Sequence, residues 1–282
     1  MAIMTQITAI DGARALKGVK PFIKWAGGKS RLLAQYEPFF PPSFRRYFEP
    51  FLGSGAVYLH LQAQPAVLSD SNSDLVNCWQ VVRDQVESLI AHLEQHQVDR
   101  DYYYRLRACA PEQLAPVERA SRLIFLNKTC YNGLYRVNRA GQFNVPFGDY
   151  KKPRIFQADH LRAVSALMQP VKIIASSFDR VLREARRGDF IYFDPPYLPL
   201  SSTSNFTGYT GQAFGVAQQE YLAEVYRTLH SRRCLLMLSN SNTQLIRDLY
   251  CGFRIEEVWA GRAINSVATR RQPIRELVVM NY

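Results

Sequence analysis

Three short apolar runs in the second half of the chain restrict its fold more than any other feature. They are residues 171–177 (VKIIASS), 189–194 (DFIYFD) and 234–240 (CLLMLSN). Continuous apolar runs of this length are typical of parallel strands that are covered by helices on both faces. The chain is therefore expected to have an α/β fold built on a mostly parallel sheet.

Further strands are expected on either side of these runs. A strand through Tyr47 and Phe48 ends in a glycine turn, an apolar helix starts at residues 56–61, and residues 66–70 (AVLSD) form a second short strand. Near the C-terminus, residues 253–260 and 274–282 are extended stretches joined by a polar arm. This pattern predicts a terminal antiparallel hairpin at the sheet edge.

The alternation of strands and helices stops between about residues 72 and 157. From Asp74 to Leu93 apolar residues recur at helical spacing, which predicts one long amphipathic helix. We expect a mainly helical insertion over residues 72–157 within a Rossmann-like catalytic domain formed by residues 20–71 and 158–282. Residues 1–19 show no clear periodicity and are interpreted as a flexible leader.

The charge of the chain predicts a polyanionic partner. The formal net charge is +11, and between residues 119 and 154 the only acidic residue is Asp149. That segment holds eight basic residues: Arg119, Arg122, Lys128, Arg136, Arg139, Lys151, Lys152 and Arg154. Interleaved aromatic residues favour a nucleic acid, because an aromatic ring can fill the gap left by a flipped base. A solvated basic face is the alternative.

The cysteines and histidines indicate neither a disulfide framework nor a metal site. The five cysteines are odd in number and widely spaced, and His92 and His96 have no evident third ligand. No run approaches the length of a membrane-spanning helix, and the N-terminus has no signal-peptide core. We therefore expect a cytoplasmic protein with reduced thiols, no metal and no membrane association.

The segment Asp194-Pro195-Pro196-Tyr197 directly follows an apolar strand, where ligands of open α/β sheets bind. An exocyclic aromatic amine is a poor nucleophile because its lone pair is delocalised into the ring. The Asp194 carboxylate and the Pro195 carbonyl can accept its two N–H groups and favour a localised lone pair. The prolines make the loop rigid, and Tyr197 can stack on the base. An ordinary strand-terminating turn is the alternative.

Residues 51–55 (FLGSG) also lie at a strand end and open a helix. Gly53 and Gly55 would let a cofactor approach the backbone, and Asp70 at the next strand end can accept hydrogen bonds from ribose hydroxyls. Tyr58 stands where a dinucleotide fingerprint has its third glycine. This disfavours the pyrophosphate of NAD and is compatible with S-adenosylmethionine.

The segment KWAGGKS at residues 24–30 precedes the first strand. A P-loop would need a glycine where the chain has Ile23, so a phosphate cradle is excluded. One aromatic residue, two glycines and a lysine suit a close lid over the carboxylate of an amino-acid cofactor. A helix-start turn is the alternative.

Together these motifs resemble the Dam-type DNA adenine-N6 methyltransferases. From about Phe22 to the C-terminus the family's order is kept: KWAGGK, EPFLGSG, SDSNSDL, an inserted recognition domain and DPPY. The segment FLNKTCYNGLYRVNRAGQFNVPFGDYKKP is similar to the target-recognition segment of enzymes that act on GATC, and residues 197–214 are similar to the family's substrate loop. The chain differs by a longer leader and by Tyr135 and Val137.

The resemblance implies roles for individual residues. The implied contacts to S-adenosylmethionine are Trp25, Lys29, Asp70 and Asp194, with Ser177 and Phe178 near its adenine. The implied DNA contacts are Lys24 and Arg136 to guanines, Leu134 and Pro146 to thymine methyl groups, Tyr131 as a wedge in the duplex, and Asn132 and Tyr150 near the DNA.

The sequence therefore predicts a site-specific DNA methyltransferase that transfers a methyl group from S-adenosylmethionine to N6 of adenine. The expected substrate is duplex DNA at GATC, methylated by base flipping and direct in-line attack. We expect a monomer of prokaryotic or phage origin that needs no protein partner. Whether a restriction endonuclease accompanies it stays open. Alternatives are a methyltransferase acting on RNA or a protein glutamine, a silent DNA-binding protein, and an NAD oxidoreductase. A cytosine-C5 enzyme would need a Pro-Cys pair, which the chain lacks.

Overall fold

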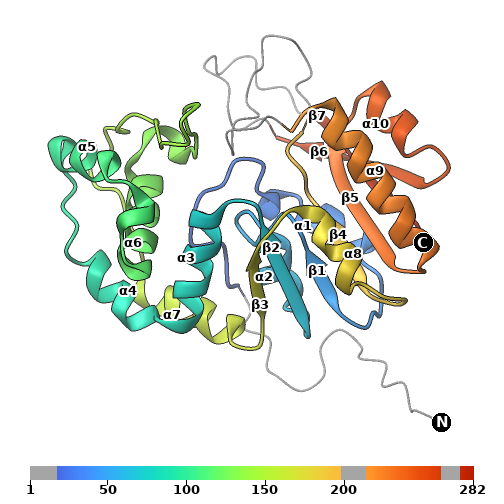
Figure 1. Ribbon diagram of the computed structural model, residues 1–282, viewed down its shortest axis with the longest axis horizontal. Helices are drawn as coiled ribbons and strands as arrows, with labels where there is room; N and C mark the ends of the chain where they lie inside the picture. Colours follow the sequence, from blue (N-terminus) through green and yellow to red (C-terminus); the bar gives the residue numbers. More distant parts are fainter. Residues whose placement is uncertain (1–17, 198–213, 262–273) are drawn as a thin grey trace.

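The structure, a computed structural model, describes residues 18–197, 214–261 and 274–282 (Figure 1). Most of the expected leader, most of the expected substrate loop and most of the polar arm therefore lie outside the described residues. The described strands form one seven-stranded sheet in the order β3-β2-β1-β4-β5-β7-β6. They are β1 (Tyr47–Glu49), β2 (Ala66–Asp70), β3 (Lys172–Ala175), β4 (Phe190–Phe193), β5 (Leu235–Ser241), β6 (Arg254–Ala260) and β7 (Ile274–Met280).

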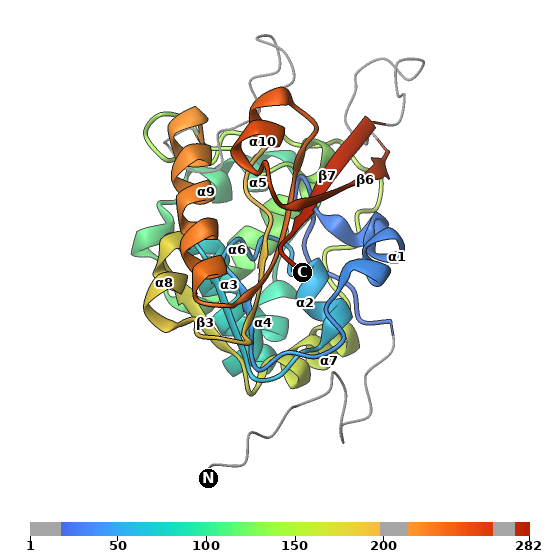
Figure 2. The same cartoon turned by 90° about the vertical axis from the view of Figure 1, so that its right-hand side faces the viewer.

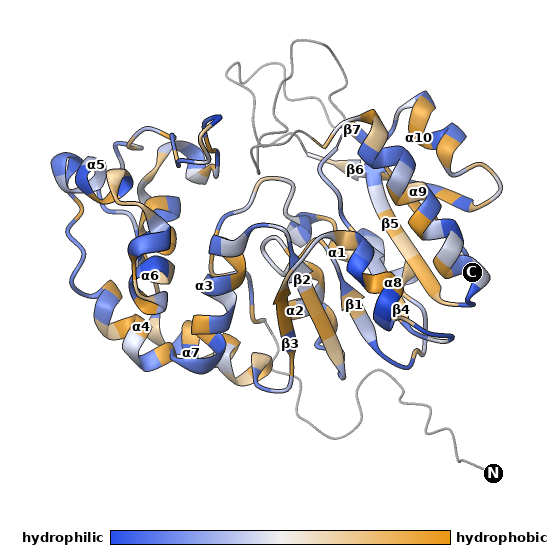
Figure 3. Cartoon of the chain, viewed as in Figure 1, coloured by the Kyte–Doolittle hydropathy of each residue, from blue (hydrophilic) through white to orange (hydrophobic). Residues whose placement is uncertain are grey.

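The sheet confirms the expected α/β class and the terminal hairpin. The first five strands pair in parallel, and β7 runs antiparallel to both β5 and β6. The last strand of the hairpin thus lies inside the sheet, and β6 forms its edge. All four residues of β4 are buried, as expected for a central strand with both faces covered. Figure 3 shows the apolar colouring of the central strands.

Helices cover both faces of the sheet and form a lobe at one side. In Figure 2, α8 and α9 lie on one face and α1 and α2 on the other, while α3 to α7 form the lobe beside β3 in Figure 1. The helices are α1 (Leu33–Tyr36), α2 (Ala56–Leu61), α3 (Ser73–Asp84), α4 (Val86–Leu93), α5 (Arg100–Ala108), α6 (Pro116–Thr129), α7 (Ala158–Met168), α8 (Val181–Glu184), α9 (Val216–Ser231) and α10 (Gln244–Leu249).

The expectation of one long helix from Asp74 to Leu93 is wrong. Gln85 leaves the helical region, with φ −140° and ψ 40°, and separates α3 from α4. Both helices keep their apolar face buried, because Trp79 of α3 and Leu89 of α4 are fully enclosed. Helical spacing is therefore preserved across a bend that the spacing itself does not reveal.

The lobe and the sheet share one apolar core. Trp79 of α3, Phe125 of α6 and Tyr192 of β4 belong to the same contiguous cluster of buried side chains. Because closely packed interiors transmit displacements, the position of the lobe relative to the sheet is set by packing as well as by chain connection.

A side-chain amide covers part of the sheet edge. Gln35 donates to the carbonyl of Trp259 in β6 at 3.0 Å and accepts from its N–H at 2.9 Å.

Among the described helices, none is both long and apolar enough to cross a membrane.

Candidate active site

Three carboxyl groups lie at the ends of three neighbouring strands. Asp70 ends β2, Glu49 ends β1 and Asp194 follows β4, and these strands are adjacent in the sheet. The sequence motifs at residues 51–55 and 194–197 are therefore brought to one edge of the sheet, as the parallel arrangement requires.

Asp194 is held through one of its two carboxylate oxygens. Lys29 approaches Oδ1 to 2.6 Å with its ammonium group, and Ser239 of β5 donates to the same oxygen at 2.9 Å. Oδ2 has no hydrogen-bond partner within the described ranges. Burial raises the pKa of Asp194 above its usual value, while the charge and hydrogen bond of Lys29 and the hydrogen bond of Ser239 lower it.

The loop after β4 is fastened by residues from α9 and β7. Gln219 of α9 is fully buried, donates to the carbonyl of Pro196 at 3.0 Å and accepts from Asn240 at 3.0 Å. The Tyr197 hydroxyl donates to Glu276 of β7 at 2.8 Å. These bonds, together with the fixed φ of the two prolines, hold residues 194–197 in place.

The glycine turn after β1 is tied to Asp70. The Gly53 N–H donates to Asp70 at 3.0 Å, and Trp79 donates its indole N–H to the Gly53 carbonyl at 3.1 Å. Gly55 has φ +65°, and a Cβ atom there would lie 2.7 Å from the Trp79 ring. Only glycine fits at this position, so the turn is shaped by packing against α3 as well as by its place before α2.

Trp25 covers the same turn from the other side. A Cβ atom at Gly53 would meet the Trp25 ring at 3.0 Å, and Trp25 stacks on Tyr135 with ring centroids 5.0 Å apart. Tyr135, one of the residues at which the chain departs from the resembled pattern, thus contacts the segment that precedes the first strand.

Phe178 contacts the first residue of the segment at residues 51–55. Its ring stacks on Phe51 with centroids 5.4 Å apart and contacts Phe214 edge-on at 5.9 Å. Ser177 is exposed and hydrogen-bonds Asp179. Of the two residues expected near the adenine, Phe178 therefore joins an aromatic cluster with Phe51 and Phe214.

Lys29 links the segment before the first strand to the loop after β4. Besides the ion pair with Asp194, its ammonium group donates to the Gly27 carbonyl at 2.6 Å and sits 4.8 Å from the centre of the Tyr197 ring. Lys29 is buried. The segment KWAGGKS therefore reaches the DPPY loop as well as the glycine turn.

Glu49 is a buried carboxyl group that sequence reasoning missed. Its Oε2 accepts from the Tyr47 hydroxyl at 2.8 Å and from the Tyr58 N–H at 3.1 Å. Burial raises the pKa of Glu49 to about 8, so the group is mostly protonated at neutral pH. Its place in the motif EPFLGSG was visible in the sequence. Ser239, Gln219 and Glu276 had no such signal, because none of them lies within a motif.

Lys24 is bound to α6, the helix in which the segment expected to recognise DNA begins. Asn127 accepts from the Lys24 N–H at 2.8 Å and donates to the Lys24 carbonyl at 2.7 Å. The Lys24 ammonium group lies 5.2 Å from the centre of the Tyr150 ring. Lys24 and the residues around position 131 are therefore brought together although about one hundred residues separate them.

The other residues expected to contact DNA differ in exposure. Tyr131 is 53% exposed, and its N–H donates to the Pro146 carbonyl at 2.9 Å. Arg136 is exposed and donates to Asn144 at 2.7 Å, and Asn132 and Pro146 are also exposed. Leu134, by contrast, is only 8% exposed.

A basic pocket of about 320 Å³ lies beside this segment. Burial and the nearby Lys24 charge lower the pKa of Lys128 to about 8. The pocket is lined by Lys24, Lys128, Tyr150, Lys151, Lys152, Pro153 and Arg154. Such a surface suits an anionic ligand.

Comparison with known proteins gives a consistent result. The model of the D12 class N6 adenine-specific DNA methyltransferases matches residues 25–264. The chain is 39% identical to a type II methyltransferase of Lactococcus lactis, M1.LlaDCHI, over 94% of this chain and 96% of that protein. It is 42% identical to the type II methyltransferase M.MjaIII of Methanocaldococcus jannaschii over 94% and 99%. It is 34% identical to the DNA adenine methylase of Escherichia coli over 94% and 96%.

Proposed function

Because the chain belongs to the D12 class of N6 adenine-specific DNA methyltransferases, we propose that it methylates adenine N6 within GATC in duplex DNA. The observation that carries the proposal is that only one of the two carboxylate oxygens of Asp194 has partners. Lys29 and Ser239 both contact Oδ1, so Oδ2 stays available to accept one N–H of the target amine. The Pro195 carbonyl supplies the second acceptor.

The residues of the loop would orient the amine before methyl transfer. Two acceptors at fixed positions hold both N–H groups, which favours a lone pair directed out of the plane of the base. The ionised carboxylate of Asp194 is a stronger acceptor than the neutral acid, and Lys29 supports the ionised state. Tyr197, held by Glu276 at 2.8 Å, would offer its ring as a stacking surface for an adenine flipped out of the duplex.

The residues around Asp70 fit S-adenosylmethionine, which supplies an electrophilic methyl group when bound. Asp70 is an acceptor suited to ribose hydroxyls, the aromatic rings of Phe51 and Phe178 suit an adenine, and the backbone of Gly53 can be approached closely. Burial raises the pKa of Asp70, while the N–H groups of Asn72 and Gly53 lower it. The chain's own hydrogen bonds thus favour the ionised acceptor.

Recognition of GATC is proposed to rest on the segment around residues 131–150. Arg136 can present a planar fork to guanine O6 and N7. Its present partner, Asn144, would fix the guanidinium orientation. Lys24, Asn132, Leu134, Pro146 and Tyr150 are proposed as further DNA contacts, with the exposed Tyr131 as the wedge.

The first test measures methyl transfer from labelled S-adenosylmethionine to a set of duplexes, each changed at one base pair of GATC. We expect methylation only of the intact site. Asp194→Ala should lower the rate at least about 10²-fold, as for other positioned catalytic groups, with an unchanged far-ultraviolet spectrum. A rate within a few-fold of the wild type would refute the role of Asp194.

Arg136→Ala separates base reading from phosphate binding on the same duplexes. Loss of a bidentate contact to guanine should cost about 1–3 kcal/mol of discrimination at one position. Asn144→Ala is the matched control, because it frees the guanidinium without removing it. An equal loss on every duplex would make Arg136 a backbone contact, and a wild-type enzyme indifferent to GATC would refute the specificity.

A further inference from the structure

Three Arg-Arg pairs stand shortly before three neighbouring strands. They are Arg45-Arg46 before β1, Arg186-Arg187 before β4 and Arg232-Arg233 before β5. Since β1, β4 and β5 are adjacent and parallel, all three pairs lie at the amino ends of the strands. We name this set the arginine edge. It lies at the amino ends of the strands, whereas Asp194 follows the carboxyl end of β4.

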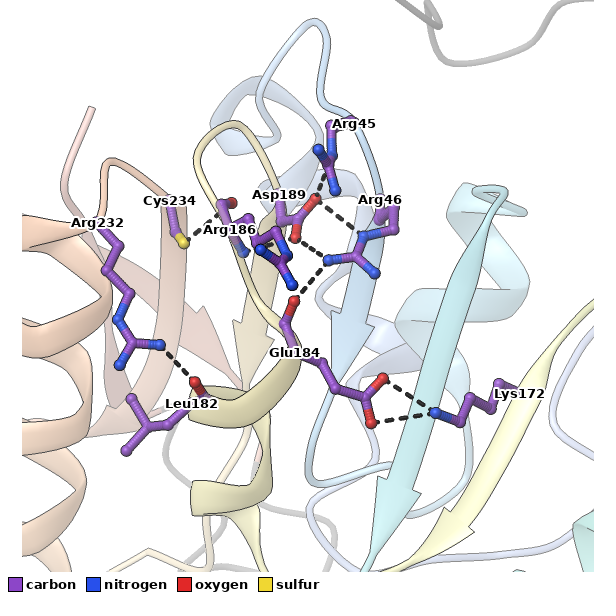
Figure 4. Close-up of polar contacts among 9 residues, drawn as sticks. All are labelled: Arg45, Arg46, Lys172, Leu182, Glu184, Arg186, Asp189, Arg232 and Cys234. Carbon is purple, nitrogen blue, oxygen red and sulfur yellow. Dashed lines mark hydrogen bonds and ion pairs between the residues drawn. The ribbon is translucent and has the colours of Figure 1, made fainter.

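The backbone holds the three pairs against one another. The Arg45 N–H donates to the Gly188 carbonyl at 2.7 Å, and the Gly188 N–H donates to the Arg233 carbonyl at 3.0 Å. Figure 4 shows how side chains of these loops meet around Asp189. The arginine edge is therefore one continuous surface rather than three separate loops.

Some of these arginines stabilise the fold. Asp189 is fully buried, and Arg45 and Arg46 approach its two oxygens to 3.2 Å and 2.6 Å. Arg46 also donates to the Glu184 carbonyl at 2.7 Å, and Arg232 donates to the Leu182 carbonyl. A buried carboxylate needs such partners, so packing accounts for this half of the set.

The other half has no such role. Arg186, Arg187 and Arg233 are exposed, and within the described residues none of their side chains has a carboxylate partner. The nearby Glu184 is already paired with Lys172 at 3.0 Å and Arg180 at 3.3 Å. The positive charges of Arg186, Arg187 and Arg233 are therefore not neutralised by any carboxylate among the residues described.

We propose that the arginine edge is a second DNA-binding site, which holds the phosphates of a duplex segment other than the one at the active site. Guanidinium groups match phosphate oxygens in geometry and charge. None of the large apolar side chains exposed in the described part of the chain lies on these loops, whereas protein interfaces usually contain an apolar centre. This favours a phosphate backbone over an acidic protein.

The position of the arginine edge affects how the enzyme would search DNA for its methylation site. The sheet separates the arginine edge from Asp194, so one short straight duplex cannot contact both. An enzyme that holds two segments can pass between them without leaving the DNA, and binding at the second site should be independent of base sequence.

The test is capture of a second duplex. A duplex containing the methylation site is fixed to beads, and a fluorescent duplex of unrelated sequence is added with or without the whole protein. The wild type should retain the fluorescent duplex. R186Q/R187Q/R233Q should retain at least about tenfold less, and the salt slope of capture should fall by roughly 3, near one unit for each phosphate that the variant no longer neutralises.

The control R162Q/R247Q/R254Q removes the same charge from arginines that already pair with carboxylates, and should capture normally. Methylation of a short duplex in the same samples reports the active site separately and should be unchanged in both variants. Two results would overturn the proposal: a wild type that holds one duplex but captures no second, or equal capture by R186Q/R187Q/R233Q.

Discussion

At the scale of single residues, Asp194 and Lys29 form the most consequential pair. Asp194 is a stronger hydrogen-bond acceptor when ionised, yet burial raises its pKa, and the nearby Lys29 charge is the main opposing influence. The pair is short, 2.6 Å, and Lys29 itself is buried. The acid limit of activity should therefore depend on Lys29.

Lys29→Met should move the acid limb of the pH profile of kcat/KM to higher pH. Removing a neighbouring opposite charge typically raises a carboxyl pKa by about 1–3 units. The measurement is methyl transfer across the acidic pH range, with Lys20→Met as the control outside the site. Uniformly lower activity with no shift of the limb would show that Lys29 serves only to bind the cofactor.

Glu49 should make stability fall as the pH rises. Its pKa is about 8 in the folded protein against 4.5 for the free group. The folded state therefore holds a proton that the unfolded state has lost between these values. The free energy of unfolding should decrease by up to about 1.4 kcal/mol per pH unit in that window.

Glu49→Gln tests this, because the amide oxygen can still accept from Tyr47 and Tyr58. The decline of the melting temperature between pH 6 and pH 8 should be smaller in the variant than in the wild type. Glu94→Gln, at an exposed site, is the matched control. Parallel curves for wild type and Glu49→Gln would refute the raised pKa.

At the scale of elements, α9 and β5 position the loop after β4 through Gln219. This buried amide joins the Pro196 carbonyl to Asn240. Gln219→Ala leaves both groups unpaired, at about 1–3 kcal/mol for a buried polar group. We expect a lower kcat with nearly unchanged affinity for the cofactor, measured by steady-state kinetics and titration. Glu220→Ala on the exposed neighbour should change neither, and equal kinetics in both variants would contradict the role.

The elements also show what the sequence can and cannot specify. Continuous apolar runs located β3, β4 and β5, and the motifs placed Asp70 and Asp194 at strand ends, because both are local properties of the chain. The bend at Gln85 was missed, since helical spacing continues through it. Ser239, Gln219 and Glu276 were missed because their contacts arise only when distant strands and helices pack together.

At the scale of the whole molecule, Trp25 connects the two regions that would bind cofactor and DNA. Its ring lies over Gly53 and stacks on Tyr135. A contact shared by two sites lets each ligand change the affinity for the other, and the effect must be reciprocal. The stacking of two aromatic rings is worth about 0.5–1.5 kcal/mol beyond their burial.

We therefore expect duplex DNA to tighten the binding of S-adenosylhomocysteine, with a smaller effect in Tyr135→Ala. Isothermal titration with and without a GATC duplex measures the coupling. Tyr104→Ala, a partly buried tyrosine elsewhere in the lobe, controls for general loosening. Equal coupling in the wild type and Tyr135→Ala would show that the stacked pair transmits nothing.

The side chain of Gln35 has a bearing on how this molecule meets copies of itself. The open backbone groups of an edge strand can recruit a strand from another chain. At Trp259 the Gln35 amide already occupies both the N–H and the carbonyl, imitating one residue of a neighbouring strand. A strand from another chain would have to displace the Gln35 amide first, so this contact opposes aggregation through the edge strand at Trp259.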